Sequence, residues 1–221
     1  MEKWYKYESQ CWYRNTFLVN KPSEISFGTT QDNTGWNNVY DGGCHFVCLA
    51  MIIGINPAYL ASVLGENTNY FTADKSIDSL HLNGIEGSLV WDQNKPDKKN
   101  PSIKLENIYH PKYGLTDIFL MFINIKKTNN KIKANKIIRE AKSEDMHVIC
   151  GYSDHSILVS GIKEDKYFLW DPDISPENKG LKEQLNGDYG LDKFYDKHSK
   201  EIENKELAEY WIYSVKYINF D

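Results

Sequence analysis

The sequence predicts an α+β fold, with helices first along the chain and the strands of one antiparallel sheet after them. Residues 44–54 (CHFVCLAMIIG) are apolar on nearly every face, which is typical of a helix in the middle of a domain. Three runs rich in β-branched and aromatic residues follow at 147–152, 156–162 and 167–172, joined by short polar segments. Helices followed by neighbouring strands form the α+β pattern.

Size and composition favour one domain with its own core. The chain has 221 residues and 41% of them are hydrophobic, which is enough to bury a core and to exclude global disorder. We therefore expect a single domain over residues 1–221, with an irregular insertion around 66–131. The net charge of −5 and the lack of a basic stripe argue against nucleic acid or an anionic membrane as a partner.

The first half of the chain has clear start and stop signals. Residues 1–40 are aromatic and polar with turn signals, so we expect an extended arm or edge strands there. Gly54 and Pro57 end the apolar helix, and residues 58–65 (AYLASVLG) predict a second short helix. Residues 66–115 carry Gly, Asn and Pro clusters and predict loops with an inserted strand or two.

The second half predicts one more helix and the sheet. Residues 132–142 have helical spacing of Ile and Ala, with basic residues on the outer face. Residues 210–218 (YWIYSVKYI) predict a last strand. We expect this strand to join the three earlier runs in one antiparallel sheet, with the helices on one side of it.

The chain has no predicted leader and no predicted membrane span. Its N-terminus lacks an apolar stretch of signal-peptide length, and no later run is long enough to cross a bilayer. The four cysteines, at positions 11, 44, 48 and 150, lack the density and spacing of a disulfide scaffold. A cytoplasmic location is the default expectation, with secretion by another route or after removal of a leader left open. The oligomeric state also stays open.

Cys44 is the candidate nucleophile. It follows Gly42 and Gly43 and begins the apolar helix. The N–H groups and dipole of a helix N-terminus favour a thiolate, and neighbouring glycines let a substrate backbone approach closely.

His155 and Asp171 are the candidate base and its orienting acid. A nucleophilic thiol needs a nearby base, usually a histidine that a third group orients. His155 precedes the strand 156–162, and Asp171 ends the strand 167–172. A short turn between antiparallel strands brings the two residues roughly level, and a bulge or stagger absorbs the small mismatch in their distances from the turn.

These residues resemble the papain-like cysteine peptidase superfamily, in its bacteriocin-processing (double-glycine) branch. The resemblance lies in a Gly-Cys before an apolar LAMI helix, a His that opens an apolar strand, and an aromatic-apolar-Asp-Pro run. The separations also fit, with 111 residues from Cys44 to His155 and 16 from His155 to Asp171. It implies a papain-like fold, in which N-terminal helices with the nucleophile pack on a sheet that carries the His and Asp. It also implies that Gln31, in TTQDNTGW, donates to the oxyanion together with the Cys44 N–H.

The activity that the resemblance implies is a cysteine peptidase-like thiol hydrolase. It cleaves peptide or amide bonds of a peptide or protein substrate through an acyl-enzyme, with no metal or organic cofactor. Two alternatives stay open: an acyltransferase with the same triad, and a catalytically inactive binding or structural module. The second is favoured by one departure, since relatives usually follow the Cys with Gly-Pro and a small hydroxyl residue, where this chain has His45 and Phe46.

The cysteines also have structural interpretations. Cys44 would be an inert core thiol if it were enclosed, and Cys48 and Cys150 are expected in the core. Cys44, His45 and Cys48 together suggest a metal, but no second Cys/His pair at zinc spacing accompanies them. Cys11 has no assigned role.

The base, the acid and the oxyanion donor each have a rival assignment. His155 would be an ordinary strand-end histidine if no partner faced it, and His147 is the alternative base. Asp173 competes with Asp171 across a proline, although only Asp171 directly ends the strand. Gln31 has an alternative reading as an ordinary surface residue.

Overall fold

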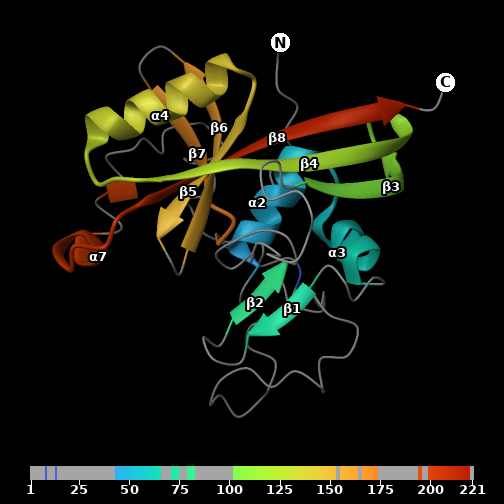
Figure 1. Ribbon diagram of the computed structural model, residues 1–221, viewed down its shortest axis with the longest axis horizontal. Helices are drawn as coiled ribbons and strands as arrows, with labels where there is room; N and C mark the ends of the chain where they lie inside the picture. Colours follow the sequence, from blue (N-terminus) through green and yellow to red (C-terminus); the bar gives the residue numbers. More distant parts are fainter. Residues whose placement is uncertain are drawn as a thin grey trace.

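The computed structural model describes residues 8, 13, 43–65, 71–74, 79–82, 102–152, 155–163, 166–173, 194–195 and 199–219. Six strands form one antiparallel sheet in the order β3-β4-β8-β5-β6-β7 (Figure 1). They are β3 (Ser102–His110), β4 (Gly114–Lys127), β5 (His147–Tyr152), β6 (His155–Lys163), β7 (Lys166–Trp170) and β8 (Glu209–Asn219). The sheet confirms the α+β expectation, and it contains all four strands predicted from the second half of the chain.

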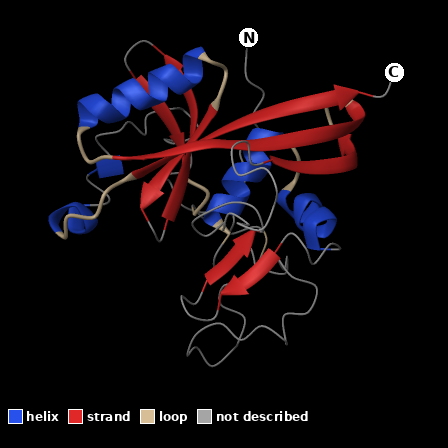
Figure 2. Ribbon diagram, viewed as in Figure 1, coloured by secondary structure: helices blue, strands red, loops and turns tan. Residues whose placement is uncertain are grey.

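Helices cover both faces of this sheet, so the expectation that they lie on one side is wrong. Helices α2 (Cys44–Ile53) and α3 (Pro57–Gly65) lie below the sheet in Figure 2, and α4 (Lys131–Ser143) lies above it. The reason lies in β5, where neighbouring residues alternate between two buried clusters. Ile149 packs in the cluster that contains α2, and Val148 packs in the one that contains α4. A strand buried on both faces needs a cover on each side.

Helix α2 is the centre of the first cluster. All its residues after Cys44 are buried, which confirms the prediction from its unbroken apolar run. It ends where Gly54 adopts the left-handed conformation, with φ of 84°, and donates its N–H to the carbonyl of Ala50. Helix α3 then starts after Asn56, whose side chain accepts the N–H of Ala58 at 2.8 Å.

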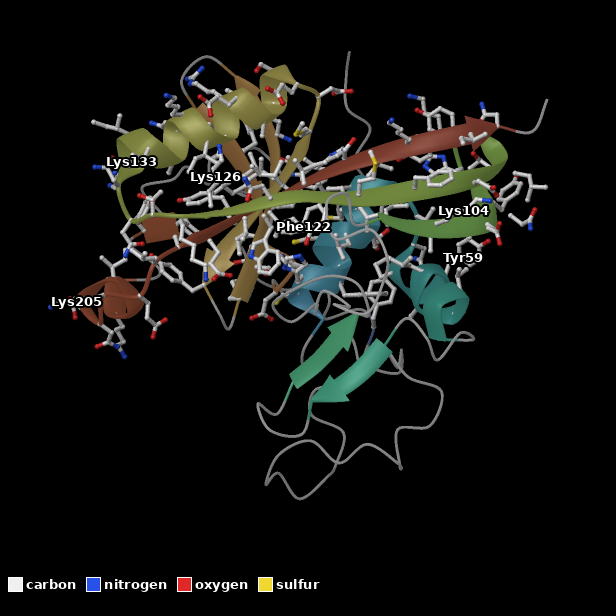
Figure 3. The ribbon with its side chains drawn as sticks, viewed as in Figure 1. Tyr59, Lys104, Phe122, Lys126, Lys133 and Lys205 are labelled. Carbon is white, nitrogen blue, oxygen red and sulfur yellow. The ribbon has the colours of Figure 1, made fainter. Side chains whose placement is uncertain are left out.

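Helix α4 covers the second cluster with one face. Its buried residues recur at helical spacing, as predicted: Ala134, Ile137, Ile138 and Ala141. The Asn130 side chain caps its first turn by accepting the N–H of Lys133. In Figure 3, Lys126 lies below the helix, and its ammonium group is 3.7 Å from the carboxylate of Glu140.

The region from 102 to 127 is more regular than its sequence indicates. Loops with an inserted strand or two were expected over residues 66–115, within an irregular insertion around 66–131, but β3 and β4 are long strands that extend the main sheet. The pattern is obscured because β3 bulges between Leu105 and Ile108, where Asn107 has a φ of 55°. Lys104 also contacts the carboxylate of Asp117 on β4 at 2.8 Å, so charged residues lie within the pair.

Three short elements complete the described structure. Strands β1 (Phe71–Asp74) and β2 (Ser79–Leu82) form a separate two-stranded sheet, and α7 (Ser199–Glu203) precedes β8. Within the described ranges, no single helix has the length and apolarity to span a membrane; α2 and α3 meet these criteria only as a pair, across a bend of 95°.

Leu49→Ala tests the central role of α2. Leu49 is 1% exposed in the first cluster, so we expect its truncation to lower the free energy of unfolding by about 2–5 kcal/mol. Urea unfolding followed by fluorescence measures the loss. Leu207→Ala is the matched control, since Leu207 is 50% exposed and should lose no more than about 0.5 kcal/mol. Equal losses in the two variants would contradict the assignment of α2 to the core.

Candidate active site

Cys44 lies at the exposed end of a buried helix. It is the first residue of α2 and the one residue of this helix that is partly exposed. The preceding Gly43 has no side chain that could cap the first-turn N–H groups. The thiol is therefore accessible and lies at the positive end of the helix dipole.

His155 faces both other members of the predicted triad. Its Nε2–H donates to Oδ1 of Asp171 at 2.8 Å, and its ring also has a side-chain hydrogen bond with Cys44. Because Asp171 occupies Nε2, Nδ1 is the nitrogen that remains for the sulfur. The structure thus brings the three residues of the predicted triad, Cys44, His155 and Asp171, together, with His155 in the middle.

The side chain of Asp171, just after the end of β7, is buried and held by hydrogen bonds. Its side chain is 0% exposed, and its Oδ1 also accepts the backbone N–H of Asp173 at 3.0 Å. Asp173 itself is exposed. Of the two rival aspartates, Asp171 is therefore the one that contacts His155.

The register of β6 and β7 explains how the base and the acid meet. Leu158 lies opposite Trp170, and the ladder shifts between Val159 and Gly161. The bulge expected from the unequal distances to the turn is present. If this register is continued, Asp171 is level with the residue two positions after His155, so the two side chains meet diagonally, within reach of each other.

The environment of His155 sets its charge. Burial alone would lower its pKa, but the hydrogen bonds and negative charges of Asp171 and Cys44 outweigh burial and raise the pKa to about 10. The ring is therefore protonated at neutral pH. An imidazolium beside a sulfur favours the thiolate, which is the nucleophilic form of cysteine.

The other histidines near the sheet do not face Cys44 as bases. His147 is at the opposite end of β5 from Tyr152, the residue that pairs with His155. His45 is 3% exposed, and its two ring nitrogens lie 3.0 Å from Ser156 Oγ and 2.8 Å from Tyr213 Oη. Burial lowers the pKa of His45 to about 3, so this ring is neutral.

His45 and Phe46, which depart from the family pattern, were expected to favour an inactive module, but the structure gives them another role. Both side chains are larger than the small residues that relatives have here, but both are buried, His45 against β6 and β8 and Phe46 in the first hydrophobic cluster. The feature that favoured an inactive module is a part of the core.

The remaining predicted residues divide into core residues and residues outside the described ranges. Cys48 and Cys150 are fully buried, as expected of core thiols, and Cys48 Sγ–H donates to the Ser156 carbonyl at 3.7 Å. Gln31 and Cys11 lie outside the described residues. Among the described residues, no group of three or more His, Cys, Asp or Glu side chains is arranged to hold a metal ion.

Gly151 is a site residue that the sequence analysis missed. An added Cβ at this position would lie 1.8 Å from the carbonyl oxygen of His155, which is far inside contact distance. The backbone of β5 thus approaches β6 at the residue that carries the base. The available signal was a glycine inside an apolar strand, which often marks a close backbone approach.

Comparisons of the chain with family models, with curated proteins and with solved structures find no match.

Gly151→Ala tests the close approach of the two strands. The new methyl group forces β5 away from His155, so we expect the free energy of unfolding to fall by about 1–3 kcal/mol and Cys44 to react more slowly with iodoacetamide. Gly161→Ala on β6 is the matched control, because its Cβ would meet only Phe168 at an ordinary 3.9 Å. Unfolding and alkylation are measured on both variants. A Gly151→Ala protein with native stability and reactivity would refute this role.

The pKa values of His45 and His155 should be shifted in opposite directions from the ordinary value of 6.5. We expect the ring of His155 to stay protonated at neutral pH and to titrate near pH 10, and the ring of His45 to stay neutral down to about pH 3. Nitrogen-15 NMR of the histidine rings measures both. Because the folded pKa of His155 lies above its ordinary 6.5, its contribution to stability is present below pH 6.5 and is lost as pH rises toward 10. A neutral His155 ring at pH 7 would contradict the ion pair.

Proposed function

We propose that this protein is a thiol hydrolase of papain-like type that cleaves peptide or amide bonds with Cys44, His155 and Asp171. One observation supports the proposal above all. A partly exposed thiol at a helix N-terminus is hydrogen-bonded to a histidine whose other nitrogen contacts a fully buried carboxylate at 2.8 Å. This is the arrangement of nucleophile, base and orienting group that acyl transfer requires.

The first half of the reaction forms the acyl-enzyme. The Cys44 thiolate attacks the carbonyl carbon of the substrate, a C–S bond forms, and the carbonyl electron pair moves to oxygen. His155 then gives its Nδ1 proton to the leaving amine as the C–N bond breaks. Asp171 keeps the ring oriented and stabilises its positive charge while the proton is held there.

The second half releases the acid. Water loses a proton to the neutral His155 and attacks the thioester carbonyl, after which the C–S bond breaks and Cys44 leaves as the thiolate. The oxyanion of both steps needs N–H donors near the sulfur. The N–H of Cys44 is one candidate, since the glycine cap leaves the first turn without a side-chain acceptor. The amide of Gln31, which the family resemblance suggests, is the other.

Acyl transfer uses the same first half-reaction and differs only in the acceptor. If an amine instead of water attacks the thioester, the product is a new amide. Hydrolysis needs no acceptor besides water, so it is the reaction that the described residues account for without a second substrate.

Thiol labelling tests the proposed nucleophile and base together. We expect iodoacetamide or a vinyl-sulfone probe to modify Cys44 before any other cysteine at neutral pH, because Cys48 and Cys150 are enclosed. His155→Gln should slow peptide hydrolysis by about 10²–10⁴-fold, since the leaving amine loses its proton donor and the attacking water loses its base. It should also slow labelling, since the reacting thiolate loses its positively charged neighbour. Peptide mapping identifies the labelled residue, and a library of fluorogenic peptides measures hydrolysis.

Two variants serve as controls. Cys44→Ser should abolish labelling at this position while the fold persists, as judged by circular dichroism. His147→Gln makes the same substitution at the far end of β5 and should leave the labelling rate unchanged. Equal labelling of all four cysteines, or equal effects of the two histidine variants, would refute the proposed site. Labelling of Cys44 with no hydrolysis of any peptide, but with acyl transfer to added amines, would make the protein a transferase.

A further inference from the structure

The hydrogen bonds of His45 lie directly beside the candidate active site. Cys44 and His45 are consecutive on α2, and His155 and Ser156 are consecutive on β6. Cys44 is paired with His155, and His45 with Ser156 Oγ at 3.0 Å, so two side-by-side contacts join the same two segments.

Ser156 has a second contact with the same helix. Its carbonyl oxygen accepts the Sγ–H of Cys48, one helical turn after Cys44, at 3.7 Å. The side chain and the backbone of Ser156 are thus both bound to α2. Ser156 is 8% exposed, so little water competes for its hydroxyl group.

His45 suits this position because it is neutral. Its ring is 3% exposed, and among the described residues no charged partner offsets the burial that lowers its pKa to about 3. A neutral imidazole has one donor and one acceptor nitrogen, and each hydroxyl beside it can donate or accept. Both ring nitrogens are therefore satisfied, by Ser156 on β6 and by Tyr213 on β8. The edges of Trp211 and Tyr213 pack around the ring, with centroids 5.1 and 5.9 Å away.

We propose that His45 and Ser156 are positioning residues, whose hydrogen bond holds the first turn of α2 against β6 so that Cys44 meets His155. This inference rests on the proposed function, because it assigns these two residues a role in the reactivity of that thiol. Neither residue touches the substrate or exchanges a proton with it. The bond acts through distance, since a thiol and an imidazole react as a pair only within hydrogen-bond reach.

A comparison of Ser156→Ala with Tyr213→Phe tests the proposal. Each substitution removes one of the two hydroxyl groups that are hydrogen-bonded to the buried ring of His45. Both should therefore lower the free energy of unfolding by a similar amount. The hydroxyl group of Ser156 belongs to β6, the strand that carries His155, whereas that of Tyr213 belongs to β8. We therefore expect Ser156→Ala to slow alkylation of Cys44 at pH 6 by about 10-fold, and Tyr213→Phe to change it by less than about 2-fold.

Two further measurements distinguish an effect on the position of Cys44 from an effect on the stability of the fold. The pH profile of alkylation should change in Ser156→Ala and should keep its native form in Tyr213→Phe. Ser156→Thr keeps the hydroxyl group and should restore both rate and profile. The proposal is overturned if Ser156→Ala keeps the native rate and profile, or if Tyr213→Phe matches its loss.

The nitrogen-15 shifts of the His155 ring distinguish a failure of this proposal from a failure of the proposed function. These shifts report the ring environment whether or not the thiol is reactive. If Cys44 proves inert in the native protein while Ser156→Ala alone moves the His155 shifts, the hydrolase assignment fails and the positioning role stands. If neither substitution moves them in a protein with a reactive Cys44, the positioning role fails and the hydrolase stands.

Discussion

The burial of α2 against β5 and β6 is the constraint on which the rest of the structure depends. Every residue of this helix after Cys44 is buried, so the helix has no freedom to rotate or shift without exposing apolar surface. Its first residue, Cys44, lies next to His155 at the start of β6. The position of the thiol is thus a consequence of core packing, and the cost of moving it is the cost of disturbing the core.

Two histidines, His45 within α2 and His155 beside it, show that the neighbouring groups decide whether an imidazole ring is charged. His45 and His155 are both largely removed from water, which by itself disfavours the charged ring in each case. His45 has two neutral hydroxyl groups as partners, and its pKa falls. His155 has the carboxylate of Asp171 and the sulfur of Cys44, and its pKa rises. One ring becomes a neutral structural link and the other a positively charged partner for the candidate nucleophile.

The two residues after Cys44 show that sequence neighbours need not lie on the same side of a helix. Two large residues beside a nucleophile suggest an obstructed site when the chain is read in one dimension. On a helix, however, neighbouring side chains point in different directions. His45 and Phe46 turn inward, where they contribute to the core and to the link with β6, while Cys44 keeps partial exposure. The departure from the family pattern is thus compatible with an accessible thiol.

The sequence by itself determined the α+β class, the limits of α2 and α4, the four strands from β5 to β8, and the three residues that meet as a candidate triad. The helices and strands could be predicted because apolar periodicity and glycine and proline breaks act over a few residues. The three triad residues were predicted from the chemistry of a thiol nucleophile and from the family resemblance. It did not predict that helices cover both faces, that β3 and β4 join the main sheet, or that Gly151 and Ser156 border the site. These features depend on contacts such as that of His45 with Ser156, 111 residues apart. Only the tertiary structure decided them, because packing and long-range pairing leave no fixed spacing in the chain.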